Sequence, residues 1–188
     1  MGKKILIINN LSGYINQLER VCGRNLKKVV EPGDIDIEQA EKYDVVFLSG
    51  GFHHEIMDSD DYYAKEIRLV RRANVPIIGV CLGFQLIAHS YGVPIHRMPR
   101  VEHSTLVIHP TELGEKILGT EPLHVYENHR WVVSKTPDNF HALATSKDGI
   151  EAIKHESSPI FGFQFHPEMF VSKTDGREIL HTILATLS

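Results

Sequence analysis

Three short apolar runs, each rich in Val and Ile, constrain the fold of this chain more than any other feature. They cover Lys4–Ile8, Asp44–Leu48 and Pro76–Val80, and a Gly, Asn or Ser turn signal follows each. Runs of this kind are typical of strands that are buried on both faces of a parallel sheet. Helical patterns separate them, and alternation of strand and helix predicts an α/β, doubly wound sheet.

Apolar spacing and end signals predict the helices between these runs. We expect helices over residues 12–25, with Ser12 as the N-cap, over 60–73 and over 82–91, with Gly92 as a C-cap. Cys22 falls on the apolar stripe of the first helix, so we predict that it is a core residue.

In the second half of the chain the pattern differs, because short β-like runs follow one another closely with turn-forming residues between them. These runs cover residues 103–108, 122–125, 131–133, 141–144, 149–153 and 160–165. We predict antiparallel additions to the sheet, and then a closing helix over about 173–187.

Composition and charge exclude several classes of protein. The chain has 188 residues, of which 42% are hydrophobic, and no linker divides it, so we predict one domain over residues 1–188. With a net charge of −4, the chain lacks the excess of basic residues that is typical of a nucleic-acid binder. The basic pairs Lys27-Lys28 and Arg71-Arg72 are expected at helix ends or faces. Signal-peptide and membrane-spanning patterns are missing, which predicts a cytoplasmic location, no membrane partner and reduced thiols at Cys22 and Cys81.

The third apolar run leads into Gly79-Val80-Cys81-Leu82-Gly83, a thiol version of the nucleophile elbow. On such a turn the nucleophile has a strained backbone, and flanking glycines remove side chains that would clash. The sulfur faces the amino end of the next helix, whose partial positive charge favours the thiolate. A structural cysteine at the end of a core strand is the alternative, but the strand-to-helix junction favours a catalytic Cys81.

The general base must come from another part of the chain, and His166 is the best candidate. It follows a β-like run, and it lies on the same side of the sheet as Cys81 if that strand is parallel to its neighbours. Glu168, two residues later, could orient the imidazole and stabilise its charged form. Ser49-Gly50-Gly51, after the second run, could bring a backbone N–H close to an oxyanion, although a simple turn is the alternative.

With these pieces in this order, the chain closely resembles the class I, triad-type glutamine amidotransferases. The stretches that match are Ser49–Gly51, Gly79–Gln85 and Phe163–Glu168. The resemblance implies a flavodoxin-like three-layer α/β/α sandwich with a mostly parallel central sheet. It also implies hydrolysis of the side-chain amide of glutamine through a cysteine thioester, with no metal or cofactor in this chain.

The resemblance also implies roles for single residues. Cys81 is the nucleophile, His166 the general base and then acid, and Glu168 its orienting partner. Gly51 and Leu82 supply backbone N–H groups for the oxyanion.

Three more residues are implied to meet the substrate. Gln85 contacts it directly, whereas Arg130 and Trp131 lie in a loop that meets the two ends of glutamine, mostly through the backbone. The chain departs from the family at Phe52, where proline is usual, and at Asn128-His129-Arg130-Trp131. His53 and His54 lie beside the glycine turn, but no metal-ligand spacing occurs, so no metal site is expected.

The ammonia must have an acceptor, and the chain contains no phosphate-binding Gly-x-x-x-x-Gly-Lys-[Ser/Thr] motif. We therefore expect ATP and Mg²⁺ only on a separate synthetase subunit. The segment Ile150–His155 and the motif after it are similar to the stand-alone amidotransferase subunit of GMP synthase, which converts XMP to GMP. His129–Val133 is as similar to the anthranilate-synthase type, and a stand-alone γ-glutamyl hydrolase or peptidase is a further alternative.

Overall fold

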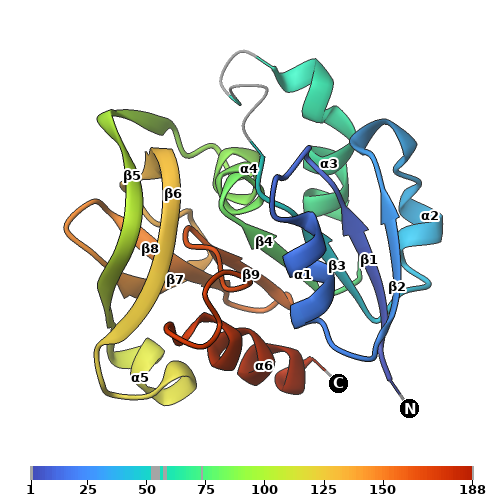
Figure 1. Ribbon diagram of the computed structural model, residues 1–188. Coiled ribbons are helices and arrows are strands. Elements are labelled where there is room, and N and C mark those ends of the chain that lie inside the picture. The colour runs from blue at the N-terminus through green and yellow to red at the C-terminus, as the bar shows by residue number, and fades with distance from the viewer. Residues whose placement is uncertain (1, 52–55, 57–58, 73, 188) are drawn as a thin grey trace.

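A computed structural model describes residues 2–51, 56, 59–72 and 74–187. These residues form a nine-stranded sheet with helices on both faces (Figure 1). In chain order the elements are β1 (Lys4–Ile8), α1 (Ile15–Val21), β2 (Leu26–Val30), η1 (Pro32–Asp34), α2 (Ile37–Ala40), β3 (Val45–Leu48), α3 (Asp60–Arg72), β4 (Ile77–Val80), α4 (Leu82–Ser90), β5 (Ile95–Pro110), α5 (Glu112–Leu118), β6 (Leu123–Val133), β7 (Phe140–Thr145), β8 (Ile150–His155), β9 (Ile160–Phe163) and α6 (Gly176–Thr186).

The sheet has a parallel half and an antiparallel half. Its strand order is β2-β1-β3-β4-β9-β8-β7-β5-β6, and the first five strands of that order pair in parallel. The order 2-1-3-4 followed by one more parallel strand is that of flavodoxin-like sheets. The remaining strands pair antiparallel. The predicted α/β class is therefore confirmed, with antiparallel additions from the second half of the chain.

Two apolar layers cover the parallel half, one on each face. Along β1, Ile5 and Ile7 pack with residues of α1 and α6, whereas Leu6 and Ile8 pack with residues of α3 and α4. Because both faces are covered, the strand is apolar throughout instead of alternating. Each fully buried Ile or Leu contributes roughly 1.5–3 kcal/mol to the free energy of unfolding.

The first predicted helix is shorter than expected, because it spans only Ile15–Val21. Ser12 does not cap it: the Ser12 hydroxyl accepts a hydrogen bond from the Tyr14 N–H at 3.1 Å, within the turn that precedes the helix. After the helix, Gly23 has a φ of +66°, a left-handed conformation that stops helical propagation.

Strand β2 was not predicted, and the placement of Lys27-Lys28 on a helix was wrong. Both lysines lie in this edge strand, which pairs with β1 on one side only. Its side chains are mostly exposed, so it lacks the apolar run by which β1 is recognised. Lysines on an edge strand also discourage pairing with another chain. Arg71-Arg72 lies in the last turn of α3, as predicted.

In the second half, two predicted runs, 122–125 and 131–133, join into the long strand β6, and the run 103–108 is part of the longer strand β5. They pair antiparallel over most of their length, with a register shift between Arg97 and Glu102. Helix α5 was not predicted; Thr111 caps it by accepting a hydrogen bond from the Gly114 N–H at 3.1 Å. None of the described helices has both the length and the apolar character needed to cross a bilayer.

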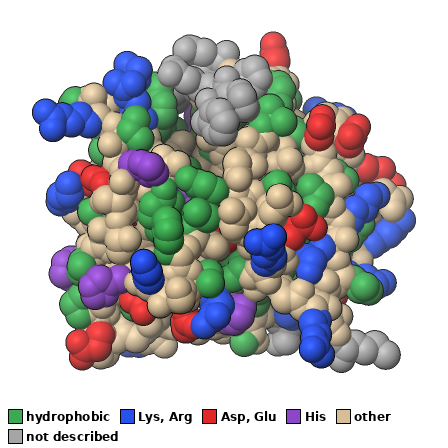
Figure 2. Space-filling model, in the orientation of Figure 1, with side chains coloured by type: hydrophobic (Ala, Val, Ile, Leu, Met, Phe, Trp, Pro, Cys, Tyr) green, Lys and Arg blue, Asp and Glu red, His purple; other side chains and the backbone are tan. Residues whose placement is uncertain are grey.

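The face drawn in Figure 2 has no patch of a single charge sign. Basic and acidic side chains intermingle over it, and hydrophobic side chains gather left of its middle. The net charge of −4 is therefore not gathered into one region of this face.

Candidate active site

Cys81 lies on a sharp turn between β4 and α4, and its backbone is strained. Its φ of 51° and ψ of −103° are rare for a residue with a side chain. The turn is packed so tightly that a Cβ on Gly83 would lie 2.2 Å from the carbonyl oxygen of Leu48. The Cys81 N–H donates to the carbonyl oxygen of Phe163 at 2.7 Å, which ties the turn to β9. The predicted elbow conformation is confirmed.

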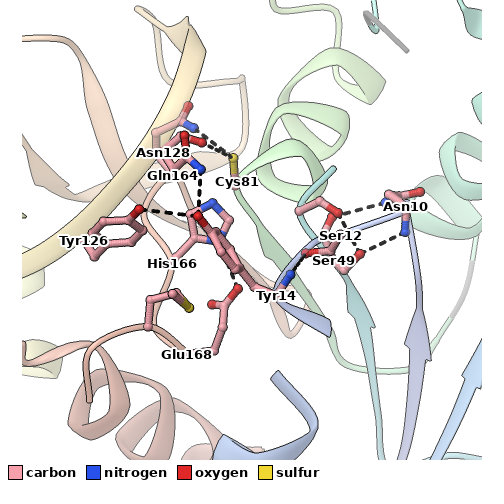
Figure 3. A network of polar contacts seen from close by, with 12 residues as sticks. Asn10, Ser12, Tyr14, Ser49, Cys81, Tyr126, Asn128, Gln164, His166 and Glu168 are labelled. Atoms are coloured by element: carbon pink, nitrogen blue, oxygen red, sulfur yellow. Dashed lines mark hydrogen bonds and ion pairs between the residues drawn. The ribbon is translucent and has the colours of Figure 1, made fainter. Parts of the chain in front are cut away.

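His166 reaches the same edge of the sheet because β9 is parallel to β4. Its Nδ1 lies 2.9 Å from Oε1 of Glu168, and both side chains are buried (Figure 3). A Cβ on Gly50 would lie 2.9 Å from Cε1 of His166 and 3.6 Å from Cβ of Cys81, so the two side chains flank one glycine. Since Nδ1 of His166 faces Glu168, Nε2 is the ring nitrogen left to interact with Cys81.

The charges around His166 favour its protonated form. Burial lowers the pKa of His166, but the negative charges of Glu168 and Cys81, with hydrogen bonds to both, outweigh it and hold the pKa well above its usual value. The site can therefore hold a proton on His166, next to the sulfur of Cys81.

The two cysteines differ sharply. Both are free, as predicted, and Cys22 is packed in the core with α1 and α6. Burial raises the pKa of Cys22 to about 12, which keeps it a thiol. Cys81 instead lines a pocket of about 460 Å³.

That pocket brings together most of the predicted site residues. Its lining includes His166 and the predicted set Gly51, Leu82, Gln85, Arg130 and Trp131. Glu168 is not part of the lining and contacts His166 from behind.

Gln85 and Trp131 contact each other directly. The Gln85 side-chain amide donates to the carbonyl oxygen of Trp131 at 2.8 Å. The Arg130 guanidinium points along β5 and donates to the carbonyl oxygens of Met98 and Pro99 at 3.4 and 3.3 Å. The side chain of Arg130 is thus hydrogen-bonded to the backbone of β5. Trp131 contacts Gln85 through its backbone carbonyl.

Tyr14 and Asn128 also reach the site; no sequence pattern pointed to Tyr14, whereas Asn128 lies in the predicted substrate loop with Arg130 and Trp131. The Tyr14 ring stands edge-on to the His166 ring, with 4.9 Å between centroids, and its hydroxyl accepts a hydrogen bond from the Asn128 amide at 2.8 Å. The carbonyl oxygen of Asn128 lies 3.8 Å from Sγ of Cys81 (Figure 3). These residues come from the loop after β1 and from β6, so only the fold brings them to Cys81.

A buried polar network holds the glycine turn beside the pocket. The Asn10 amide donates to the carbonyl oxygen of Ser49 at 3.2 Å and to Oε1 of Glu66 at 3.0 Å. A Cβ on Gly51 would lie 2.1 Å from the carbonyl oxygen of Asn10, so only glycine fits. Glu66 is fully buried on α3, and burial raises its pKa to about 8.

We expect Glu66→Gln to stabilise the protein in a pH-dependent way. Between pH 4.5, the ordinary pKa, and about 8, the unfolded chain releases this proton while the folded chain keeps it. The free energy of unfolding of the wild type therefore falls as pH rises, by up to about 1.4 kcal/mol per pH unit. The glutamine side chain of the variant does not ionise, so this decrease in the free energy of unfolding is absent. Its amide oxygen can still accept a hydrogen bond from Asn10. Urea unfolding at pH 4.5, 6 and 8 should show a growing advantage of the variant, and a pH-independent difference would contradict this assignment.

Metal binding has no support among the described residues. Within residues 2–51, 56, 59–72 and 74–187, no group of three His, Cys, Asp or Glu side chains could hold a metal ion. Phe52, His53 and His54, which the sequence singled out, lie outside the described residues.

Comparison with known proteins establishes the family. The family profile described as glutamine amidotransferase class-I matches residues 6–186. This chain belongs to the class I glutamine amidotransferases. The amidotransferase is 43% identical over 170 residues to a protein from Thermococcus kodakarensis that is named as the glutamine-hydrolyzing subunit of GMP synthase, and the match covers 88% of this chain and 89% of that one. The protein of the same name from Pyrococcus abyssi is 34% identical over 182 residues, and the match covers 94% of both chains.

Solved structures share the fold of this amidotransferase. A crystal structure from Thermoplasma acidophilum, provisionally assigned to the same component of GMP synthase, superimposes with a TM-score of 0.86 at 25% identity, covering 100% of this chain and 94% of that one. A glutamine amidotransferase from Thermotoga maritima superimposes with a TM-score of 0.77 at 16% identity and covers 100% and 98%. The flavodoxin-like sandwich expected from the sequence is thus the fold of solved members of the family.

Proposed function

We propose that this amidotransferase hydrolyses L-glutamine to glutamate and ammonia with Cys81, His166 and Glu168 as a catalytic triad. One observation carries the proposal: Cys81 sits on a strained turn at a pocket, and the His166 that lines the same pocket pairs with Glu168 at 2.9 Å. A thiolate beside a protonated imidazole is the activated state of a cysteine nucleophile.

In the first half of the reaction the Cys81 thiolate attacks the side-chain amide carbon of glutamine. The N–H groups of Gly51 and Leu82 stabilise the negative oxygen of the tetrahedral intermediate. His166 then donates its proton to the departing nitrogen, the C–N bond breaks, and ammonia leaves a γ-glutamyl thioester on Cys81.

In the second half a water molecule cleaves the thioester. His166, now neutral, takes a proton from the water as it attacks the carbonyl carbon. The C–S bond breaks, glutamate leaves, and the thiolate and the protonated imidazole are restored. Glu168 keeps the ring in one orientation and stabilises its charge in both halves. Every proton is supplied by the chain or by water, so we propose that this chain needs no cofactor.

We further propose that residues 1–188 act as one amidotransferase domain that passes ammonia to a separate synthetase subunit. The relatives from Thermococcus kodakarensis and Pyrococcus abyssi are named as the glutamine-hydrolyzing subunit of GMP synthase and align over most of both chains. The partner would then bind ATP and Mg²⁺ and convert XMP to GMP.

The test measures glutamate release and GMP formation with the purified chain alone, and with a separate ATP-dependent synthetase from the same organism. We expect slow hydrolysis alone and stimulation by at least about tenfold, within the usual range of coupling between sites, when the synthetase, XMP, ATP and Mg²⁺ are present. Full activity alone toward many γ-glutamyl compounds, with no stimulation, would instead identify a stand-alone hydrolase.

A further inference from the structure

Three buried polar side chains at the pocket have no role in this mechanism, and one of them, His129, is part of its lining. Glu127 and His129 lie on β6 and Glu151 lies on β8, and their exposed fractions are 0%, 5% and 1%. Buried carboxyl and imidazole groups are costly unless they are paired, so such a cluster requires an explanation.

One ring nitrogen of His129 faces the Glu127 carboxyl, and Glu151 contributes a second buried carboxyl to the cluster. Nε2 of His129 lies 3.0 Å from Oε2 of Glu127. Burial raises the pKa of Glu127 to about 7, although a hydrogen bond with Glu151 opposes this shift. Burial and the charge of Glu127 hold the pKa of Glu151 well above its usual range. The Ser146 hydroxyl donates to Oε1 of Glu151 at 2.6 Å and fixes that carboxyl.

The other ring nitrogen of His129 points to the backbone of its own strand. Nδ1 lies 3.1 Å from the carbonyl oxygen of Trp131. A carbonyl oxygen only accepts hydrogen bonds, so Nδ1 must carry a hydrogen. Nε2 faces the Glu127 carboxyl at 3.0 Å, and burial lowers the pKa of His129, so the neutral ring carries its one hydrogen on Nδ1.

The carbonyl oxygen of Trp131 in turn fixes the side-chain amide of Gln85. Nε2 of Gln85 donates to this oxygen at 2.8 Å and to Oε1 of Gln164 at 3.3 Å. Both amide hydrogens are thereby used. The amide oxygen of Gln85, which lines the pocket with Cys81, is left to accept a hydrogen bond from a ligand.

The chain of contacts continues to the nucleophile. The Gln164 amide donates toward Sγ of Cys81, with 3.9 Å between the atoms (Figure 3). A flip of the Gln85 amide would therefore disturb its contacts with Trp131 and Gln164 together.

We propose that His129, whose Nε2 faces Glu127, is a positioning residue that acts through the Trp131 carbonyl to keep the Gln85 amide oxygen facing a donor group of bound glutamine. The inference rests on the proposed glutaminase function. It predicts that loss of the Nδ1 hydrogen bond weakens glutamine binding more than it slows the chemistry at Cys81.

Two matched variants separate the two ring nitrogens. The side-chain amide of Asn reaches the position of Nδ1, so His129→Asn keeps a donor for Trp131 and loses the contact with Glu127. The longer Gln reaches the position of Nε2, so His129→Gln keeps the contact with Glu127 and loses the donor for Trp131. We expect His129→Gln to raise the KM for glutamine about tenfold, the effect of one lost hydrogen bond, and His129→Asn to stay within about threefold of wild type.

Alkylation by iodoacetamide is the control, since it reports the reactivity of Cys81 without a glutamine site. The alkylation rate should be the same in wild type and both variants. Equal increases in KM for the two variants, or alkylation slowed in parallel with KM, would overturn the proposal. Failure of the proposed function would look different, because wild type itself would then lack glutaminase activity.

A third variant leaves His129 in place and tests the same inference if either replacement prevents folding. The amide of Glu127→Gln can donate to Nε2 of His129, which requires the hydrogen on Nδ1. We expect this variant to keep the KM of wild type for glutamine. A KM raised about tenfold, as expected for loss of the hydrogen bond from Nδ1 to Trp131, would overturn the proposal.

Discussion

Cys81→Ser is expected to lower the rate of glutamine hydrolysis by at least about 10⁴-fold, in line with losses seen when a catalytic nucleophile is removed. A serine hydroxyl stays protonated where a cysteine can be a thiolate, so the ion pair with His166 is lost together with the nucleophile. The side chain is nearly isosteric, and the strained turn is set by the glycines around it, so the fold should persist. Glutamate release under single-turnover conditions, with circular dichroism as a check on folding, measures the effect.

Cys22→Ala is the matched control for that experiment. Cys22 is the second cysteine of the chain and lies in the core, away from the pocket lining. We expect this variant to keep the wild-type kcat and to lose some thermal stability, because a small cavity replaces the sulfur. Glutamine turnover at a wild-type rate by the Cys81→Ser protein would exclude Cys81 as the nucleophile.

His166→Gln is expected to lower the rate of glutamine hydrolysis by about 10²–10⁴-fold, because the general acid and base is removed. It should also destabilise the protein by about 3–5 kcal/mol, since Glu168 is left as a buried carboxylate without its partner. Thermal unfolding and single-turnover hydrolysis measure the two effects separately.

The double variant His166→Gln, Glu168→Gln distinguishes chemistry from stability. Removing the buried charge should restore most of the melting temperature, since two neutral amides can pair where the ion pair was. It should not restore activity, because neither amide can transfer a proton. Recovery of turnover along with stability would mean that His166 is needed only for folding.

The buried strands of the parallel half and the elbow were predictable from sequence, because local patterns indicate both. Val45–Leu48 and Ile77–Val80 are apolar on both faces, and glycines at positions 79 and 83 flank Cys81 directly after the second of these strands. The alternation of strands with helices then placed the carboxyl ends of these strands at one edge of the sheet, where a site is expected.

The sequence by itself therefore determined the α/β class, the position of the candidate nucleophile and the candidates for its partners. Only the tertiary structure decided that β9 is parallel to β4, which brings His166 to Cys81, and that Leu26–Val30 is an edge strand. It alone paired Glu66 with Asn10 and Glu127 with His129. Local patterns record which side chains prefer to be buried, whereas pairing between distant segments depends on strand register and packing. For that reason a buried glutamate looks like any solvent-exposed one until the fold supplies its partner.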